Sequence, residues 1–153
     1  YIRKLSNEQL FEKISPFVPQ DFPQDKISQV LPLIQERLVT LADFADLTKF
    51  FHGSISYETD LLLKKADSKE LVTRQLNETI QEIEALADWN LHQLEEKVIS
   101  LQEKRNWHRG QFFMMLRIAA TGEKATPPLF DTMIVLGKKL LMSRLKEALN
   151  KLS

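Results

Sequence analysis

The sequence predicts an all-α fold. Apolar residues recur three or four positions apart along most of the 153-residue chain, as they do on the buried face of an amphipathic helix. One such run advances by four, four, three and four residues through Val72, Leu76, Ile80, Ile83 and Ala87. No comparable alternating run of β-branched residues indicates a strand, and four glycines leave few positions for hairpin turns. We therefore expect helices throughout.

The first part of the chain is predicted to form three helices. Ser6 and Gln9 have the spacing of a capping box, in which each side chain bonds to a backbone N–H of the other residue. A helix is therefore expected over residues 6–15. Apolar residues at helical spacing predict the other two, a helix over 24–38 with a bend at Pro32 and a helix over 41–46.

A domain boundary is predicted at the stretch FHGSISYE, residues 51–58. The helical periodicity lapses there, between two regions that are helical on either side. We therefore expect two helical subdomains, an N-terminal one over residues 1–56 and a C-terminal one over residues 57–153.

Six further helices are expected after this boundary. Ser68 has the character of an N-cap, and Asn90 with Gln93 has the spacing of a capping box. Helix ends are indicated by Gly122, by Gly137 and by the adjacent Arg109 and Gly110. The predicted helices cover residues 58–65, 69–88, 91–106, 110–120, 127–136 and 138–151.

The helix predicted after Thr126 begins with two consecutive prolines. Proline at the first helical position loses no hydrogen bond and has its backbone angle already set. We therefore expect Thr126 to be the N-cap, with its hydroxyl accepting from a free amide, and Pro127 to open the helix.

The charge of the chain is balanced overall but uneven along its length. The sequence has 21 basic and 21 acidic residues, yet residues 102–153 hold ten Lys and Arg against four acids, a net charge of +6 that the first 101 residues offset. A basic end is what a contact with a polyanion requires, although a solvated surface with uneven charge explains it equally well. The absence of cysteine and of a long apolar run favours a cytoplasmic protein outside the membrane.

The sequence lacks the usual signals of catalysis. The histidines His52, His92 and His108 are far apart and form no metal-binding pattern, and the common nucleotide-binding loops are absent. Pairs of acidic residues lie on predicted amphipathic helices, where a solvated face explains them. The chain therefore reads as a binding module that holds no metal or cofactor of its own.

Three features bear on what the module binds. Trp89 and Trp107 each end a predicted helix, where a tryptophan more often fills a hinge or core than stacks on a base. The run FFMML, residues 112–116, is interpreted as core. Arg117 follows it and must reach a partner or solvent, because burying an unpaired charge is costly.

Arg117 and the segment TPPLF, residues 126–130, lie within ten residues of one another, with the Gly122 turn between them. A reversal of the chain at this turn would bring the free amides of the second helix close to Arg117. An arginine beside a helix N-terminus can hold an anion, and Pro127, Leu129 and Phe130 offer flat surface to an unstacked base. The residues alone do not identify the ligand.

Several stretches together resemble the C-terminal anticodon-binding region of bacterial-type glutamyl-tRNA synthetases. The most specific is GQFFMMLRIAATGEKATPPLFDTMIVLGKKLLMSRLKEAL, residues 110–149, which holds the family's TG turn, P-x-L-F helix start and L-G-K motif. IRKLSNEQLFEKISPF and VLPLIQERLVTLADFADLTKFF match in the first half, so that the resemblance covers nearly the whole chain.

The resemblance implies a helical bundle joined to a helical cage, forming the tail of a class I aminoacyl-tRNA synthetase. Such a tail grips the anticodon loop of glutamate tRNA and in some members also that of glutamine tRNA, and it acts as a monomer. Catalysis, with ATP and Mg²⁺, would belong to an N-terminal domain in the same polypeptide, whose HIGH-like and KMSKS-like signatures are absent here. The compartment implied is the cytoplasm or an organelle.

The resemblance also assigns roles to residues. Arg117, Thr126, Pro127 and Leu129 match the residues that line the pocket for the first and middle anticodon letters. Arg37 matches an arginine associated with reading the third letter and rejecting glutamine tRNA. The chain departs from the family at Met115, where proline is common, and at Ala120, where leucine is usual.

Two other interpretations remain open from the residues themselves. A helical protein-interaction module could use the basic C-terminal end to contact an acidic partner. A helix-turn-helix DNA reader is disfavoured, because no short helix pair carries clustered base-reading polar residues.

Overall fold

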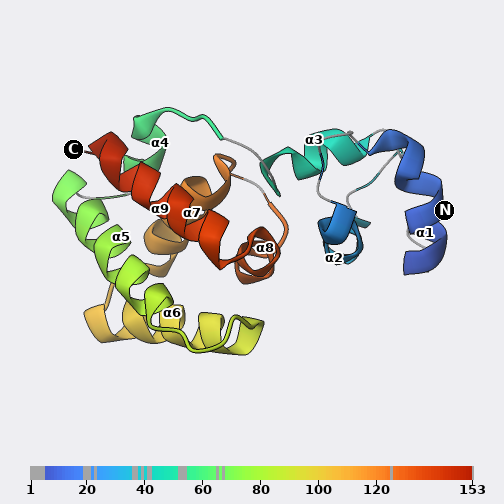
Figure 1. Ribbon diagram of the computed structural model, residues 1–153. Helices are drawn as coiled ribbons and strands as arrows, with labels where there is room; N and C mark the ends of the chain where they lie inside the picture. The colour runs from blue at the N-terminus through green and yellow to red at the C-terminus, as the bar shows by residue number, and fades with distance from the viewer. Residues whose placement is uncertain are drawn as a thin grey trace. The chain divides into compact units, whose positions relative to one another are not determined.

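The computed structural model describes residues 6–18, 22, 24–35, 38, 40, 43–51, 55–64, 66, 68–124 and 126–152. Every regular element among these residues is a helix, which confirms the all-α prediction (Figure 1). The chain divides into two compact units, Tyr1–Ser54 and Ile55–Ser153, each of which is described by itself.

In its described residues the first unit contains three α-helices and two short 3-10 helices. They are α1 (Asn7–Ile14), η2 (Ser15–Phe17), α2 (Gln24–Ile34), α3 (Phe44–Thr48) and η5 (Lys49–Phe51). The predicted capping box is confirmed, because Ser6 Oγ accepts from the Gln9 N–H at 3.2 Å and Gln9 Oε1 accepts from the Ser6 N–H at 3.1 Å. The α1 helix packs on α2.

The α2 helix is shorter than its periodicity predicts. It contains Pro32 and ends at Ile34, after which the Leu38 N–H bonds to the carbonyl of Ile34 at 3.2 Å. The core of the unit includes Phe22 and Phe44, whose rings meet edge to face at 5.3 Å. Arg37, to which the resemblance assigns the third anticodon letter, lies outside the described residues.

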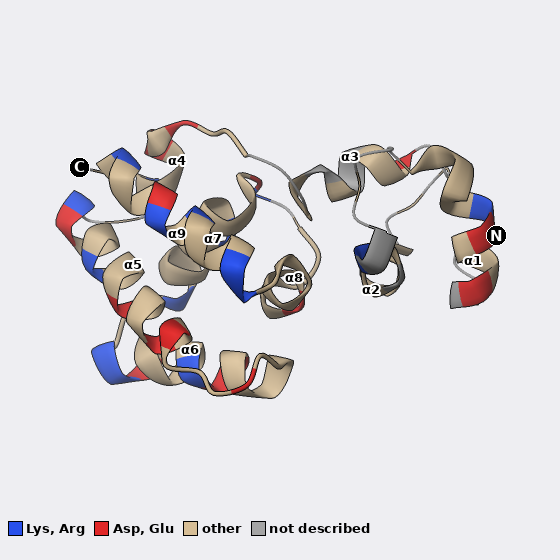
Figure 2. Cartoon of the chain, viewed as in Figure 1, with Lys and Arg blue, Asp and Glu red and all other residues tan. Residues whose placement is uncertain are grey.

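The second unit contains six helices in its described part. They are α4 (Thr59–Leu63), α5 (Lys69–Glu84), α6 (Leu91–Arg105), α7 (Arg109–Thr121), α8 (Leu129–Leu136) and α9 (Lys138–Leu152). The α9 helix packs against α5, α7 and α8, while α6 contacts α5 and α8, and α4 contacts α7. Acidic and basic residues are interleaved on the outer faces of α5, α6 and α9 (Figure 2).

The predicted helix starts at Ser68 and Asn90 are confirmed. Ser68 Oγ accepts from the Leu71 N–H at 3.1 Å, and Asn90 Oδ1 accepts from the Gln93 N–H at 2.9 Å. Each bond satisfies one of the backbone donors that the first turn of a helix leaves without an intrahelical partner. The α5 helix ends at Glu84, four residues before the predicted end, because the Leu86 N–H bonds to the carbonyl of Ile83 and tightens the chain there.

The helix end predicted at Arg109 and Gly110 is wrong. The α6 helix ends at Arg105, and Asn106 adopts the left-handed conformation, with φ 54°, which asparagine tolerates better than most residues. The next helix then begins at Arg109, so Gly110 lies in its first turn. Its N-cap is His108, whose Nδ1 accepts from the Gln111 N–H at 3.1 Å. The glycine was the misleading signal, because it marks no turn here.

Both tryptophans fill gaps between helices, as the sequence predicts. Trp107 is 9% exposed and packs against Phe112, with ring centroids 4.9 Å apart. Trp89 is half-buried, and its Nε1 donates to the carbonyl of Ile134 at 3.1 Å, which ties the segment before α6 to α8. The burial of Trp107 and the hydrogen bond of Trp89 favour a structural role for both over a role as surfaces for stacking bases.

Candidate nucleic-acid interface

Arg117 lies one turn before the end of α7. The helix buries Phe112, Met115, Leu116 and Ala119 in the core of the second unit, whereas Arg117 is only half-buried. The hydroxyl of Thr121 donates to the carbonyl of Arg117 at 2.7 Å. This bond closes the last turn of α7 around the residue that carries the guanidinium.

Gly122 ends α7 in a conformation that requires glycine. Its φ is +73°, and its N–H bonds to the carbonyl of Ile118 at 2.7 Å. A Cβ at this position would lie 3.3 Å from Cδ1 of Tyr57, which is tighter than ordinary van der Waals contact. The turn after α7 is therefore set both by backbone conformation and by the segment that packs against it. It is also tied by Thr121, whose hydroxyl accepts from the Glu123 N–H at 3.0 Å.

The start of α8 differs from the prediction. Pro128, not Thr126, is the N-cap, and Leu129, not Pro127, is the first helical residue. A residue before proline is pushed out of the α region by the proline ring, so Pro127 cannot open a helix when Pro128 follows it. The helix starts directly after the second proline, where the chain is no longer restricted in this way.

The Thr126 hydroxyl has a different role from the predicted cap. It donates to the carbonyl of Pro127 at 2.7 Å instead of accepting from an amide of α8. Thr132, in the second turn of α8, donates to the same carbonyl at 3.2 Å. The first turn of α8 therefore has no side-chain cap, and the amides at such a helix start are donors that suit an anion.

The structure brings α7 and α8 together through an aromatic contact. Phe113 and Phe130, both half-buried, meet edge to face with ring centroids 5.9 Å apart. Phe113 precedes Arg117 by one turn and so lies on the same side of α7. We call Arg117, Thr126, Pro127 and Leu129 the α7–α8 corner, and the two phenylalanines join its two helices.

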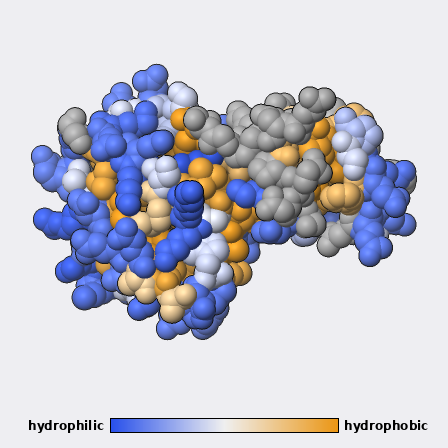
Figure 3. Space-filling view, in the orientation of Figure 1, coloured by the Kyte–Doolittle hydropathy of each residue, from blue (hydrophilic) through white to orange (hydrophobic). Residues whose placement is uncertain are grey.

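Exposure varies across the α7–α8 corner. Pro127 and Leu129 are buried, Leu129 to 7% exposure, whereas Thr126 is half-buried and Pro128 is exposed. Hydrophobic surface shows between the hydrophilic side chains of the second unit (Figure 3). Phe113 was missed in the sequence, where it forms part of a run interpreted as core. Its spacing of four residues from Arg117 was the signal that could have found it.

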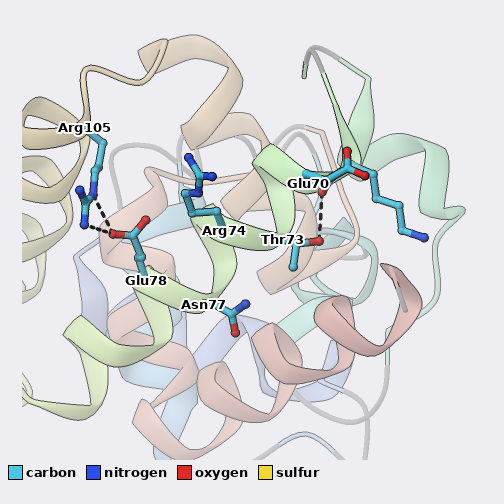
Figure 4. A pocket seen from close by; sticks show the side chains of 7 residues that line it. Glu70, Thr73, Arg74, Asn77, Glu78 and Arg105 are labelled. Atoms are coloured by element: carbon cyan, nitrogen blue, oxygen red, sulfur yellow. Dashed lines mark hydrogen bonds and ion pairs between the residues drawn. The ribbon is translucent and has the colours of Figure 1, made fainter.

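A concave feature of the second unit lies away from the α7–α8 corner. An open pocket of about 650 Å³ is lined by one face of α5 and by Arg105 of α6 (Figure 4). Arg105 is paired with Glu78, its Nε donating to Oε1 at 2.7 Å, and basic and acidic side chains are mixed around the pocket. None of the residues of the α7–α8 corner lines it.

The described residues also bear on metal binding and on membrane insertion. In this part of the chain no group of three or more His, Asp or Glu side chains could hold a metal ion. None of the helices that the structure describes is long and apolar enough to cross a membrane.

Comparisons with known proteins were made for the whole chain. Residues 9–149 match the family model described as the anticodon binding domain. The chain is 35% identical to a glutamate–tRNA ligase from Dehalococcoides mccartyi, with 100% of this chain and 34% of the relative covered. It is 32% identical to a glutamate–tRNA ligase from Roseiflexus castenholzii, with 100% and 32% covered. The chain thus spans about a third of the length of these relatives.

The chain also has the same fold as part of two solved glutamate tRNA ligase structures. A crystal structure of a glutamate tRNA ligase from Elizabethkingia meningosepticum, in complex with its amino acid, superposes with a TM-score of 0.86 at 26% identity. It covers 100% of this chain and 31% of that one. The ligase from Elizabethkingia anophelis gives a TM-score of 0.81 at 25% identity, over 98% of this chain and 30% of that one.

Proposed function

We propose, from the premise that the chain belongs to the anticodon binding domain family, that it grips the anticodon loop of glutamate tRNA. The observation that carries the proposal is the α7–α8 corner. There an arginine one turn before the end of α7 and the uncapped start of α8 lie on two helices that pack together through Phe113 and Phe130.

The α7–α8 corner offers the chemistry that recognition of a single-stranded loop needs. Proteins read such loops by stacking unstacked bases on flat side chains and by bonding to the edges of the bases. The guanidinium of Arg117 is a planar fork of donors that fits a base edge or a phosphate. We assign this corner to the first and middle anticodon letters, with Thr126, Pro127 and Leu129 shaping the wall and Arg117 supplying the donors.

The activity of the whole enzyme is inferred from its relatives, which are named glutamate–tRNA ligases and are about three times as long as this chain. We infer that a catalytic domain in the same polypeptide joins glutamate to its tRNA with ATP and Mg²⁺, and that neither binds within this chain. We expect the enzyme to act as a monomer in the cytoplasm or in an organelle.

Binding to an isolated anticodon stem-loop tests the proposal. The 153-residue chain should bind RNA that carries the glutamate anticodon, and the binding should weaken as salt rises. Arg117→Ala should cost about 1–3 kcal/mol, which is roughly a five- to 150-fold rise in Kd, measured by fluorescence anisotropy. Thr126→Ala should weaken binding less, because its hydroxyl bonds to the Pro127 carbonyl and shapes the wall.

The matched control for Arg117→Ala is Arg74→Ala. It removes the same charge from an exposed position on α5, outside the α7–α8 corner, and should leave the Kd almost unchanged. Equal affinity of the Arg117→Ala and Thr126→Ala variants and the wild type, together with unchanged charging by the full-length enzyme, would show that the site is assigned wrongly.

We further propose that Arg37 reads the third anticodon letter and helps to reject glutamine tRNA. The proposal rests on the match of the stretch ERLVTL, residues 36–41, to the family. Arg37→Gln in the full-length enzyme should narrow the preference for glutamate tRNA over glutamine tRNA, measured as the ratio of kcat/KM values for charging. An unchanged ratio would show that Arg37 does not help to reject glutamine tRNA.

The uneven charge favours one alternative function, a helical protein-interaction module. Residues 102–153 carry a net charge of +6, which also suits an acidic protein partner. A pull-down that recovers a protein but no tRNA would favour this alternative. Recovery of tRNA would favour the anticodon-binding role.

A further inference from the structure

Arg144 occupies an unusual place on the inner face of α9. The residue is 2% exposed and lies among Leu141, Leu145 and Ala148, which are fully buried on the same helix. Its Nη1 donates to the carbonyl of Ala120 at 2.6 Å. Arg144 thus lies at a position of α9 where the spacing of the apolar residues predicts an apolar side chain.

The bond from Arg144 satisfies a group that α7 cannot satisfy itself. Ala120 is the penultimate residue of α7, and the last four carbonyls of a helix have no intrahelical donor. A positive charge is also favoured beside the negative end of the helix dipole. Arg144 therefore fastens the last turn of α7 to α9.

This last turn sets the geometry of the α7–α8 corner. It carries Arg117 three residues before Ala120 and the Gly122 turn two residues after it. Thr121, next to Ala120, bonds to the carbonyl of Arg117 and to the amide of Glu123. A shift of the Ala120 carbonyl would move both Arg117 and the direction in which the chain leaves for Thr126.

Burying the charged guanidinium of Arg144 is unfavourable, because the charge loses its contact with water. Burial lowers the pKa of Arg144 from 12.5 to about 10, although the Glu147 carboxylate acts in the opposite direction. The side chain is still charged at neutral pH, but folding disfavours that charge. An apolar side chain of similar volume would fill the same space without the desolvation cost. Packing alone therefore does not explain why the residue is an arginine.

We propose that Arg144 is a positioning residue for the α7–α8 corner, which holds Arg117 and the start of α8 in the arrangement that the anticodon requires. This inference rests on the proposed function. Arg144 acts through the Ala120 carbonyl and, being buried, makes no contact with RNA itself.

The test compares three variants of the 153-residue chain by anisotropy with the glutamate anticodon stem-loop. Binding is measured at a temperature at which circular dichroism shows each variant to be fully folded. Arg144→Met should raise the Kd by roughly tenfold, which equals about 1.4 kcal/mol. Arg144→Lys, which keeps a donor and a charge, should recover most of the affinity. Lys146→Met is the matched control, because it removes a positive charge from the exposed side of α9 and should leave the Kd unchanged.

The salt dependence separates positioning from direct contact. A side chain that neutralises a phosphate contributes about one unit to the slope of log Kd against log salt. Arg144→Met should therefore keep the wild-type slope while losing affinity. Wild-type affinity in the folded Met variant would show that Arg144 is purely structural, and a slope lower by one would show that it contacts RNA; either result overturns the proposal.

Thr121→Val keeps the proposal testable if Arg144→Met does not fold. This milder change removes the hydroxyl that ties the Arg117 carbonyl to the Glu123 amide within the same turn. It should also weaken binding at an unchanged salt slope, and wild-type affinity would count against positioning by this turn. If the wild-type chain itself fails to bind the stem-loop, that result contradicts the proposed function, and with it the positioning role of Arg144.

Discussion

Tyr57 joins three segments of the second unit beside the α7–α8 corner. Its Cδ1 is the atom that a Cβ on Gly122 would approach to 3.3 Å. Its ring lies 4.8 Å from the ammonium of Lys151 on α9, and its carbonyl accepts from the same ammonium at 3.4 Å. One side chain thus links the start of the unit, the turn after α7 and the C-terminal helix.

The buried phenol of Tyr57 predicts a loss of stability at high pH. Burial and, to a smaller extent, the nearby Glu147 carboxylate together raise the pKa of Tyr57 to about 12. In the unfolded chain a tyrosine ionises near its ordinary pKa of about 10. Between these two values the folded state keeps a proton that the unfolded state has lost, so the free energy of unfolding falls as pH rises.

Comparison with Tyr57→Phe isolates this contribution. Arg144, whose pKa in the folded chain is lowered to about 10, makes the free energy of unfolding rise with pH above that value. This effect of Arg144 is the same in the wild type and in Tyr57→Phe. The free energy of unfolding from urea titrations should fall more steeply from pH 9.5 to 11.5 in the wild type than in Tyr57→Phe. Parallel curves would mean that the phenol of Tyr57 ionises as readily in the folded chain as in the unfolded one.

At the scale of elements, the start of α7 depends on His108. Its Nδ1 accepts from the Gln111 N–H, so it serves as an N-cap, a role that the sequence analysis did not assign to it. His108→Ala should destabilise the chain by about 1 kcal/mol, because a backbone donor loses its partner. His108→Asp should keep the acceptor, add a negative charge at the positive end of the helix, and retain at least the wild-type stability.

Thermal unfolding checks the role of His108. The melting temperature should fall for His108→Ala and should not fall for His108→Asp. His92→Ala is the matched control, because His92 is exposed on α6 and pairs with Glu96 on its own helix, at 3.3 Å. Equal melting temperatures for the wild type and His108→Ala would show that the cap contributes nothing to stability.

The helices themselves were largely predictable, and the errors lie where two local signals compete. Apolar periodicity located each helix of the second unit, and Ser6, Ser68 and Asn90 marked starts correctly because capping depends on residues three positions apart. The α6–α7 boundary was predicted to within one residue, but its turn was assigned to Gly110, whereas Asn106 takes the left-handed conformation. The start of α8 was misplaced because the restriction that one proline imposes on another outweighs the preference for proline at the first position.

The candidate site was predictable only where its residues are close in sequence. Arg117 and the TPPL segment could be connected because one turn separates them. The spacing of Phe113 from Arg117 indicates its side of α7, but not its contact with Phe130 across the helices. Arg144 could not be assigned, because its role comes from a contact with Ala120, 24 residues away. A lone arginine among the apolar positions of α9 was a signal of an unusual role, but the sequence does not say which carbonyl it meets.

At the scale of the whole molecule, the two units divide the work of recognition in the proposed function. Residues 55–153 form a unit with its own core, which includes the fully buried Leu76, Leu94, Phe112 and Leu145. This unit holds the whole α7–α8 corner, whereas Arg37 belongs to the first unit. Affinity for the first two anticodon letters and discrimination at the third should therefore be separable.

Expression of residues 55–153 alone tests this division. Because its core is built from its own helices, the fragment should unfold in one cooperative transition and should bind the glutamate anticodon stem-loop. It should bind with almost equal affinity a second stem-loop that differs only in the third letter and carries the glutamine anticodon, because Arg37 is missing. Competition anisotropy with the two RNAs measures this preference.

The whole chain with Arg37→Gln is the matched control for the fragment. It keeps the first unit and should lose the preference between the two stem-loops to the same extent. A fragment that retains the full preference would place discrimination in residues 55–153 and would remove the reason for assigning the third letter to Arg37. A fragment that does not fold would show instead that the second unit needs the first for stability, so that reading the anticodon could not be divided between them.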